Sequence, residues 1–144
     1  MLVFILFILS SLYLWGYYPV QEKLSIMAME KLKLKLRKFA KERNWDQFHS
    51  PKNLTMALAG ETGELLELFQ WLKEEETQAS RLSKSDLIRV KEEMADIYIY
   101  LIRLADKLDV DLDKEADKKI KQNKKKYPVK LSKNNAVKYN RRNE

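Results

Sequence analysis

The chain of 144 residues contains no cysteine, one histidine, three glycines and three prolines. The absence of cysteine excludes disulfides, thiolate catalysis and cysteine-ligated zinc sites. Few glycines and prolines disfavour turn-rich β architectures and long disordered segments. A chain of this length forms one domain by prior expectation. We therefore expect an all-α fold.

Basic residues outnumber acidic ones and gather in two stretches. The chain has 28 Lys and Arg against 21 Asp and Glu, which gives a formal net charge of +7. The basic residues concentrate in residues 31–43 and 114–142, on either side of an acidic middle. This distribution favours a polyanionic partner.

Residues 2–20 are nearly all apolar and contain no charged side chain. At a rise of ~1.5 Å per residue, a helix of this length spans most of a hydrocarbon core of ~30 Å. One interpretation is a membrane anchor, with the basic residues that follow it on the cytoplasmic side. The other is that synthesis begins at Met27 or Met29. A cleaved signal is less favoured because no basic region comes first. Both interpretations place the remainder in the cytoplasm.

A helix is predicted over residues 25–44, although the alternation in residues 31–38 imitates a strand. A loop follows over residues 44–51. Ser50 and Pro51 close it as a predicted N-cap and first helical position.

The next predicted helix, residues 54–72, turns two glutamates toward its apolar face. At about 100° per residue, its leucines form one arc. Glu61 falls inside that arc and Glu64 at its edge, whereas Glu67 falls on the opposite side. Carboxylates are rarely buried without a compensating charge. A cation is therefore expected beside this helix.

Residues 87–108 repeat the arrangement on a second helix, with a seam of apolar residues at helical spacing. Glu93 falls within the seam, Asp96 at its edge and Glu92 outside it. Because residues three apart share a helix face, each helix offers a carboxylate pair. Two such helices packed antiparallel would bring four acids together, as in carboxylate metal sites of helical bundles. The alternative is that these acids form a solvated helix face.

Oxygen ligands without cysteine or a nearby histidine favour Mg²⁺, or Mn²⁺, rather than zinc. Magnesium commonly binds phosphate oxygens as well, so a basic, acid-cored helical protein indicates phosphate-ester chemistry.

The connection between the two acidic helices is polar, and Ser83 or Ser85 is the predicted cap of the second. Asp111 is the predicted cap of a last helix that ends at Tyr127 and Pro128. Residues 129–144 form a basic polar tail.

Several other side chains carry two interpretations each. Trp45, Phe48 and Trp71 either stack on a nucleobase or belong to the core. For His49, a role in loop structure or capping is favoured over contact with a base.

The glycines and lysines are equally ambiguous. Gly60 and Gly63 lie within a predicted helix, where each glycine lowers helix stability by about 1 kcal/mol relative to alanine. They allow either close approach of a ligand or backbone to Glu61, or tight helix packing. The lysines of residues 119–126 either bind phosphates or form a solvated face.

Three stretches, GETGELLELFQW, KEEMADIYIYL and KKIKQNKKKYP, resemble the MazG-like all-α nucleoside triphosphate pyrophosphohydrolases. That family's pattern is E-x-x-E followed after a gap by E-x-x-D, and Glu61, Glu64, Glu93 and Asp96 match it. ERNWDQFHSPKNLTMALAGETGELLELFQW and YPVKLSKNNAVKY most resemble the dCTP pyrophosphatase branch. The likeness runs from about residue 39 to residue 139.

The resemblance implies an oligomer with a four-helix bundle core. Residues 2–20 lie outside the resemblance and would add an apolar helix. The resemblance implies that the four matching acids are metal ligands and catalytic residues. It also implies a substrate-binding set, in which the tryptophans enclose the base and the others surround sugar and phosphates; with His49 included, this set is Trp45, His49, Trp71, Tyr100, Lys119, Asn123, Lys126 and Tyr127.

Two positions depart from the family pattern and bear on the choice of nucleobase. Lys126 stands where the family often has arginine, and it lacks arginine's bidentate fork. Leu36 occupies a place where the dCTP branch can carry a polar base contact.

We thus predict an apolar segment (1–22), a MazG-like helical domain (23–128) and a basic polar tail (129–144). The predicted function is Mg²⁺-dependent hydrolysis of a nucleoside triphosphate to monophosphate and diphosphate, with dCTP or a modified dCTP preferred, for nucleotide pool sanitation. The predicted assembly is a homodimer or homotetramer, a membrane partner is expected only through residues 2–20, and nucleic acid is not expected. The alternatives are a dUTP or broad-range pyrophosphatase, or a non-catalytic membrane-tethered adaptor with a basic tail.

Overall fold

The structure is a computed structural model that describes residues 27–141, and this part of the chain consists of helices joined by turns and loops, without a strand. The predicted all-α class is confirmed. Residues 27–42 form a helix, here called the N-terminal helix. The later elements are η1 (Trp45–Gln47), α2 (Pro51–Glu67), η2 (Glu74–Glu76), α3 (Lys84–Lys107), α4 (Leu112–Lys126), α5 (Val129–Ser132) and η3 (Tyr139–Arg141).

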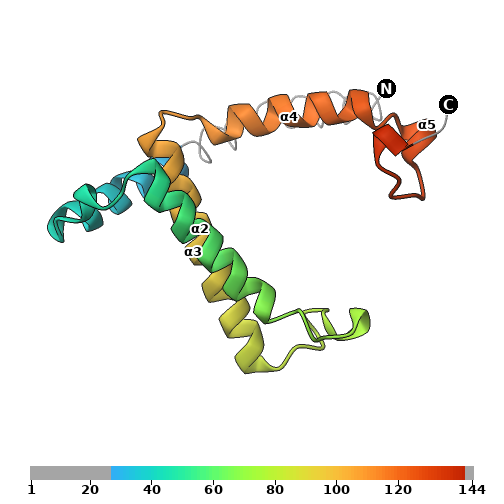
Figure 1. Ribbon diagram of the computed structural model, residues 1–144, viewed down its shortest axis with the longest axis horizontal. Helices are drawn as coiled ribbons and strands as arrows, with labels where there is room; N and C mark the ends of the chain where they lie inside the picture. The colour runs from blue at the N-terminus through green and yellow to red at the C-terminus, as the bar shows by residue number, and fades with distance from the viewer. Residues whose placement is uncertain (1–26, 142–144) are drawn as a thin grey trace, which may run out of the picture.

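The helices α2 and α3 pack side by side as an antiparallel hairpin (Figure 1). The N-terminal helix lies across the end of the hairpin where α2 begins and α3 finishes. From that same end α4 projects away, and α5 and η3 lie at its far tip. Residues 27–141 therefore supply one packed helix pair with two arms, and within this part of the chain no further helix pair completes a four-helix bundle.

The helix starts follow the capping residues predicted from the sequence. The side chains of Ser50, Ser83 and Asp111 each accept a hydrogen bond from the backbone N–H three residues later, at 3.2, 3.0 and 3.1 Å. Such caps satisfy N–H groups that have no partner within the helix. The last predicted stop is also confirmed, because α4 ends at Lys126 with Tyr127 as its C-cap.

The predicted end of the first acidic helix is wrong. Rather than continuing to Leu72, α2 ends at Glu67. The N–H groups of Phe69 and Leu72 bond carbonyls three residues earlier, each at 3.0 Å, so the chain tightens into turns. The chain turns here because α3 returns alongside α2, a tertiary requirement that helical periodicity does not contain.

The core is small and sits mostly where the N-terminal helix meets the hairpin. Its fully buried large side chains are Leu54 of α2 and Ile102 of α3. The predicted seam on α3 is correct at Val90, but Met94 and Leu108 are 57% and 53% exposed. Much of the seam face thus lies open in a single chain, because α3 also buries the side that carries Ile102.

Within residues 27–141, no helix combines the length and apolar character needed to cross a bilayer. The anchor predicted for residues 2–20, and the boundary predicted at residue 22, lie outside the described residues. Residues 129–141, which belong to the predicted tail, are almost all exposed and include the short helices α5 and η3.

Candidate metal centre

Three of the four predicted ligands meet halfway along the hairpin. Glu61 and Glu64 on α2 and Glu93 on α3 each place one carboxylate oxygen within 4.8 Å of the others. Glu61 and Glu93 are half-buried, and Glu64 is exposed. Asp96, on the next turn of α3, is exposed and stands outside this group, yet it is close enough for its charge to act on Glu61. The predicted inward phasing is thus observed at Glu61 and Glu93, whereas Glu64 and Asp96, predicted at the edges of the buried faces, are exposed.

The cluster holds negative charge without a cation. Burial, followed by repulsion from Glu64, Asp96 and Glu93, raises the pKa of Glu61 above its usual range. None of the ion pairs between described residues includes any of these four acids. A donor set made only of carboxylate oxygens suits a hard divalent cation. The structure therefore contains an acidic cluster that could bind a divalent metal.

Open space lies beside the cluster. Apart from the adjacent residues and backbone of its own helix, a Cβ atom added at Gly60 or Gly63 would meet no described atom within 4 Å. Tight packing against the described residues therefore does not explain why glycine stands at these helical positions. The remaining interpretation is that a ligand or another chain comes close to them.

A second group of predicted residues lies near the start of α2. Trp45 is 43% exposed and packs edge-on against Phe39, with ring centroids 5.8 Å apart, and against His49, at 6.3 Å. The loop position that was favoured for His49 is observed. Glu61 comes ten residues after Pro51, so the cluster lies about 15 Å further along the helix axis.

The other predicted aromatics are more scattered. Trp71 follows the end of α2 and is 87% exposed, and Phe48 is also exposed, so neither belongs to the core of this chain. Tyr100 is half-buried on α3, one turn beyond Asp96. The two tryptophans proposed to enclose a base thus lie near opposite ends of α2.

The residues predicted around the phosphates are far from the acids within one chain. Lys119, Asn123 and Lys126 are exposed on α4, which leads away from the hairpin (Figure 1). Tyr127 packs against Tyr139 with ring centroids 5.8 Å apart. No local pattern in the sequence indicates the direction that α4 takes.

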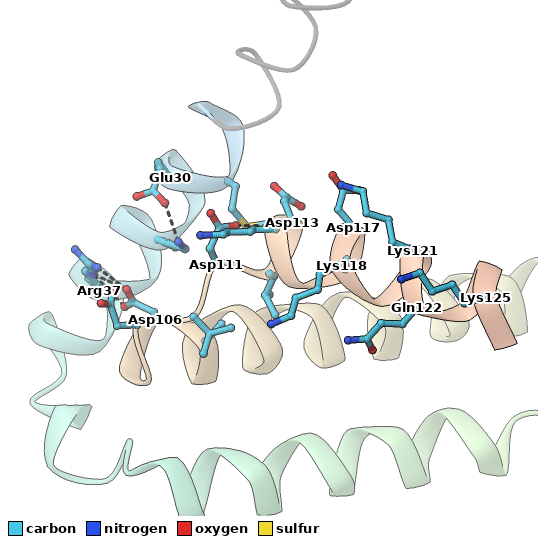
Figure 2. A pocket seen from close by; sticks show the side chains of 18 residues that line it. Glu30, Arg37, Asp106, Asp111, Asp113, Asp117, Lys118, Lys121, Gln122 and Lys125 are labelled. Carbon is cyan, nitrogen blue, oxygen red and sulfur yellow. Dashed lines mark hydrogen bonds and ion pairs between the residues drawn. The ribbon is translucent and has the colours of Figure 1, made fainter.

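Sequence reasoning missed a second charged cluster, formed by Arg37, Asp46, Arg103, Asp106 and Lys107. It lies where the N-terminal helix meets α3, beside an open cleft that continues along α4 (Figure 2). The spacing of Arg103 and Asp106, three residues apart, was the one signal in the sequence that could have indicated it.

The chain matches the model of a known protein family. A MazG-like family model matches residues 57–141, which include all four acids. The chain belongs to the MazG-like family. The resemblance predicted from the sequence is thereby confirmed.

Several proteins are similar to this chain over 70% of its length. The chain is 48% identical to dCTP pyrophosphatase 1 of Bos taurus and 43% identical to that of Homo sapiens, each over 101 residues. This covers 70% of the chain and about 60% of the length of those relatives. A crystal structure of a pyrophosphatase from Archaeoglobus fulgidus superposes with a TM-score of 0.65 at 37% identity, covering 70% of this chain and 93% of that one.

Proposed function

We propose that this MazG-like protein hydrolyses nucleoside triphosphates to the monophosphate and diphosphate, with dCTP or a modified dCTP preferred. The observation that carries the proposal is the convergence of Glu61, Glu64 and Glu93 around a point that no cation of the described chain reaches. The similarity to proteins named dCTP pyrophosphatase 1 supports the choice of substrate. Removal of unwanted nucleotides from the cytoplasmic pool would be its use.

The metal of this proposal is Mg²⁺, with Mn²⁺ as the alternative. Glu61, Glu64 and Glu93 would hold it, and Asp96 would complete or orient the set. The ion supplies charge neutralisation of the triphosphate and a lower pKa for a bound water. One of the carboxylates accepts the proton of the attacking water, whose oxygen forms a bond to phosphorus as the bond between the α phosphate and the diphosphate breaks.

The substrate needs residues that one chain does not bring together. Lys119, Asn123 and Lys126 carry the charge and polarity that suit phosphates, but α4 holds them away from the acids. The exposed apolar side chains Met94 and Leu108 on α3 are those expected to be covered in an assembly. We therefore infer a homodimer or homotetramer in which α4 of one copy reaches the hairpin of another.

For the nucleobase, we assign Trp45 and Trp71 to stacking and Tyr100 to the sugar side, with His49 beside Trp45. Trp71 is exposed enough to stack without any rearrangement of the core. Base–aromatic stacking contributes about 1–3 kcal/mol per base.

The test is to incubate the purified full chain with Mg²⁺ and each nucleoside triphosphate in turn, and to quantify monophosphate and diphosphate by chromatography. We expect dCMP from dCTP, and a loss of activity in Glu61→Gln and Asp96→Asn. Glu67→Gln is the matched control, because Glu67 lies on the exposed face of the same helix. Absence of monophosphate from every nucleotide would refute the enzyme proposal, and preferential cleavage of dUTP would replace the substrate.

A non-catalytic adaptor makes a different prediction for the same samples. Its basic α4 and tail would bind anionic vesicles in a salt-sensitive manner that does not depend on Mg²⁺. Such binding without release of diphosphate would favour the adaptor.

A further inference from the structure

Arg103 is a buried cation whose three nitrogens all have partners. Its side chain is 5% exposed, and a buried charge destabilises a fold unless it is paired. Nη1 donates to Oδ2 of Asp106 at 2.9 Å, and Nη2 donates to Oδ1 of Asp46. The remaining nitrogen, Nε, donates to Nδ1 of His49 at 3.4 Å. The guanidinium thus connects α3 to the loop that carries Trp45.

The surrounding charges hold this arrangement from two sides. Nε of Arg37, on the N-terminal helix, donates to Oδ2 of Asp106 at 3.0 Å (Figure 2). Nζ of Lys107 donates to Oδ1 of Asp46 at 3.1 Å. Arg37, Arg103 and Lys107 therefore face two carboxylates, which leaves a surplus of positive charge beside the imidazole.

This environment selects one form of His49. Arginine can only donate hydrogen bonds, so Nδ1 of His49 must accept, and a neutral imidazole that accepts at Nδ1 carries its proton on Nε2. Burial and the positive charge of Arg103 lower the pKa of His49, which keeps the ring neutral near pH 7. No described residue accepts a hydrogen bond from Nε2. The ring therefore retains one donor for another molecule.

A fixed donor beside an exposed tryptophan discriminates among bases. A base stacked on Trp45 would lie next to His49, because the two rings pack 6.3 Å apart. The Watson–Crick edge of cytosine offers two acceptors, N3 and O2, next to its amino donor. A donor held in place by the protein pairs with such an acceptor, whereas a ring free to change tautomer would not distinguish an acceptor from a donor.

We propose that Arg103 is a positioning residue that holds His49 as the Nε2–H tautomer, which makes His49 an obligate hydrogen-bond donor to an acceptor of the cytosine ring bound beside Trp45. The assignment of the base rests on the proposed function. The assignment of the tautomer stands on the geometry alone.

The first experiment is nuclear magnetic resonance of the full chain labelled with ¹⁵N-histidine. Because the sequence contains one histidine, both ring-nitrogen signals belong to His49. At about pH 8, above the ordinary histidine pKa of ~6.5, we expect the proton on Nε2 in the wild type. We expect a mixture of tautomers in Arg103→Met, and an intermediate result in Arg103→Lys, which keeps the charge without the fork. Arg89→Met, at an exposed arginine of the same helix, should match the wild type.

The second experiment measures KM and kcat for dCTP with the same variants. For Arg103→Met we expect KM to rise about 10-fold, the effect of losing one base-reading hydrogen bond, with kcat within about 2-fold of wild type. His49→Gln should retain more affinity than His49→Ala, because the amide can still donate. Circular dichroism identifies any variant that loses helix, and the His49 pair tests the donor without disturbing the buried guanidinium.

A proton on Nδ1 in the wild type, or an unchanged tautomer in Arg103→Met, would overturn the proposal. A changed tautomer with unchanged KM, or equal affinity in His49→Gln and His49→Ala, would overturn the role toward the base. If the wild type cleaves no nucleotide, the proposed function fails, while the resonance result still decides the tautomer.

Discussion

Two clusters of carboxylates in the described part of the chain are in opposite electrostatic states. Halfway along the hairpin, Glu61 meets other acids, and its pKa is raised by burial and by their charge. Near the end of α3, the side chain of Asp106 is only 6% exposed, but its pKa is lowered, first by the hydrogen bond from Arg37. Both clusters lie between helices. The difference is that Arg37, Arg103 and Lys107 pair with the carboxylates of the second cluster. No ion pair between described residues includes the acids of the first.

Paired carboxylates and mutually repelling carboxylates are expected to play different roles, the first in stability and the second in ligand binding. Carboxylates that the chain has already neutralised contribute to stability, and removal of one leaves a buried cation without part of its partner. Carboxylates that repel each other lower stability until a ligand arrives, which is a frequent signature of functional sites.

The largest effect is expected from loss of a ligand in the acidic cluster. Glu93→Gln should lower Mg²⁺-dependent activity at least about 100-fold, since an amide binds a divalent cation far less well than a carboxylate. The free energy of unfolding in EDTA should stay the same or rise, because repulsion is relieved. Glu92→Gln, at an exposed neighbour outside the cluster, is the control. A large loss of metal-free stability in Glu93→Gln would mean that this cluster also stabilises the fold.

Metal addition should stabilise only through the acidic cluster. At about 100 times its dissociation constant, Mg²⁺ should raise the free energy of unfolding by about 2.7 kcal/mol through mass action. Thermal melts with Mg²⁺ and with EDTA measure this difference. The shift should be absent in Glu61→Gln and retained in Asp106→Asn; equal shifts in all three proteins would place the ion elsewhere.

Loss of a carboxylate in the paired cluster should affect stability instead. Asp106→Asn should lower the free energy of unfolding by about 2 kcal/mol, because Arg103 keeps Asp46 but loses its more deeply buried partner. Chemical denaturation measures the change. Asp117→Asn, at an exposed position on α4, is the control and should change little.

The paired cluster should also set an acid limit on stability. The pKa of Asp106 is lower in the folded chain than its ordinary value of 3.8. Its contribution is therefore complete above that ordinary value and is lost as pH falls through the lower folded pKa. Below about pH 4, wild type should lose stability more steeply than Asp106→Asn. Parallel pH profiles of the two proteins would show that Asp106 does not titrate in this way.

The smallest effect concerns the glycine that follows Glu61 by two residues. Gly63→Ala should raise the free energy of unfolding by up to about 1 kcal/mol, because alanine favours the helix and its Cβ meets no atom of this chain within 4 Å. If a ligand or second copy needs this space, activity should fall while stability rises. Increased stability with full activity would show that neither comes close to Gly63.

Local structure was largely predictable, because its causes lie within a few residues. The caps at Ser50, Ser83 and Asp111 were predicted from hydroxyl and carboxylate side chains ahead of helical patterns, and each makes the expected bond. The inward phase of Glu61 and Glu93 followed from helical periodicity alone. The end of α2 at Glu67 was missed, since no glycine or proline marks it and the cause is the return of α3.

Of the candidate site, the sequence determined which carboxylates share a helix face, because side-chain direction repeats with the helical period. Only the tertiary structure decided which carboxylates meet a cation. Arg103 finds Asp46 across 57 residues of sequence, and Arg37 finds Asp106 across 69. Contacts of this kind follow from how helices cross rather than from any local pattern. For the same reason, only the folded chain reveals that α4 carries its lysines away from the acids that would need them.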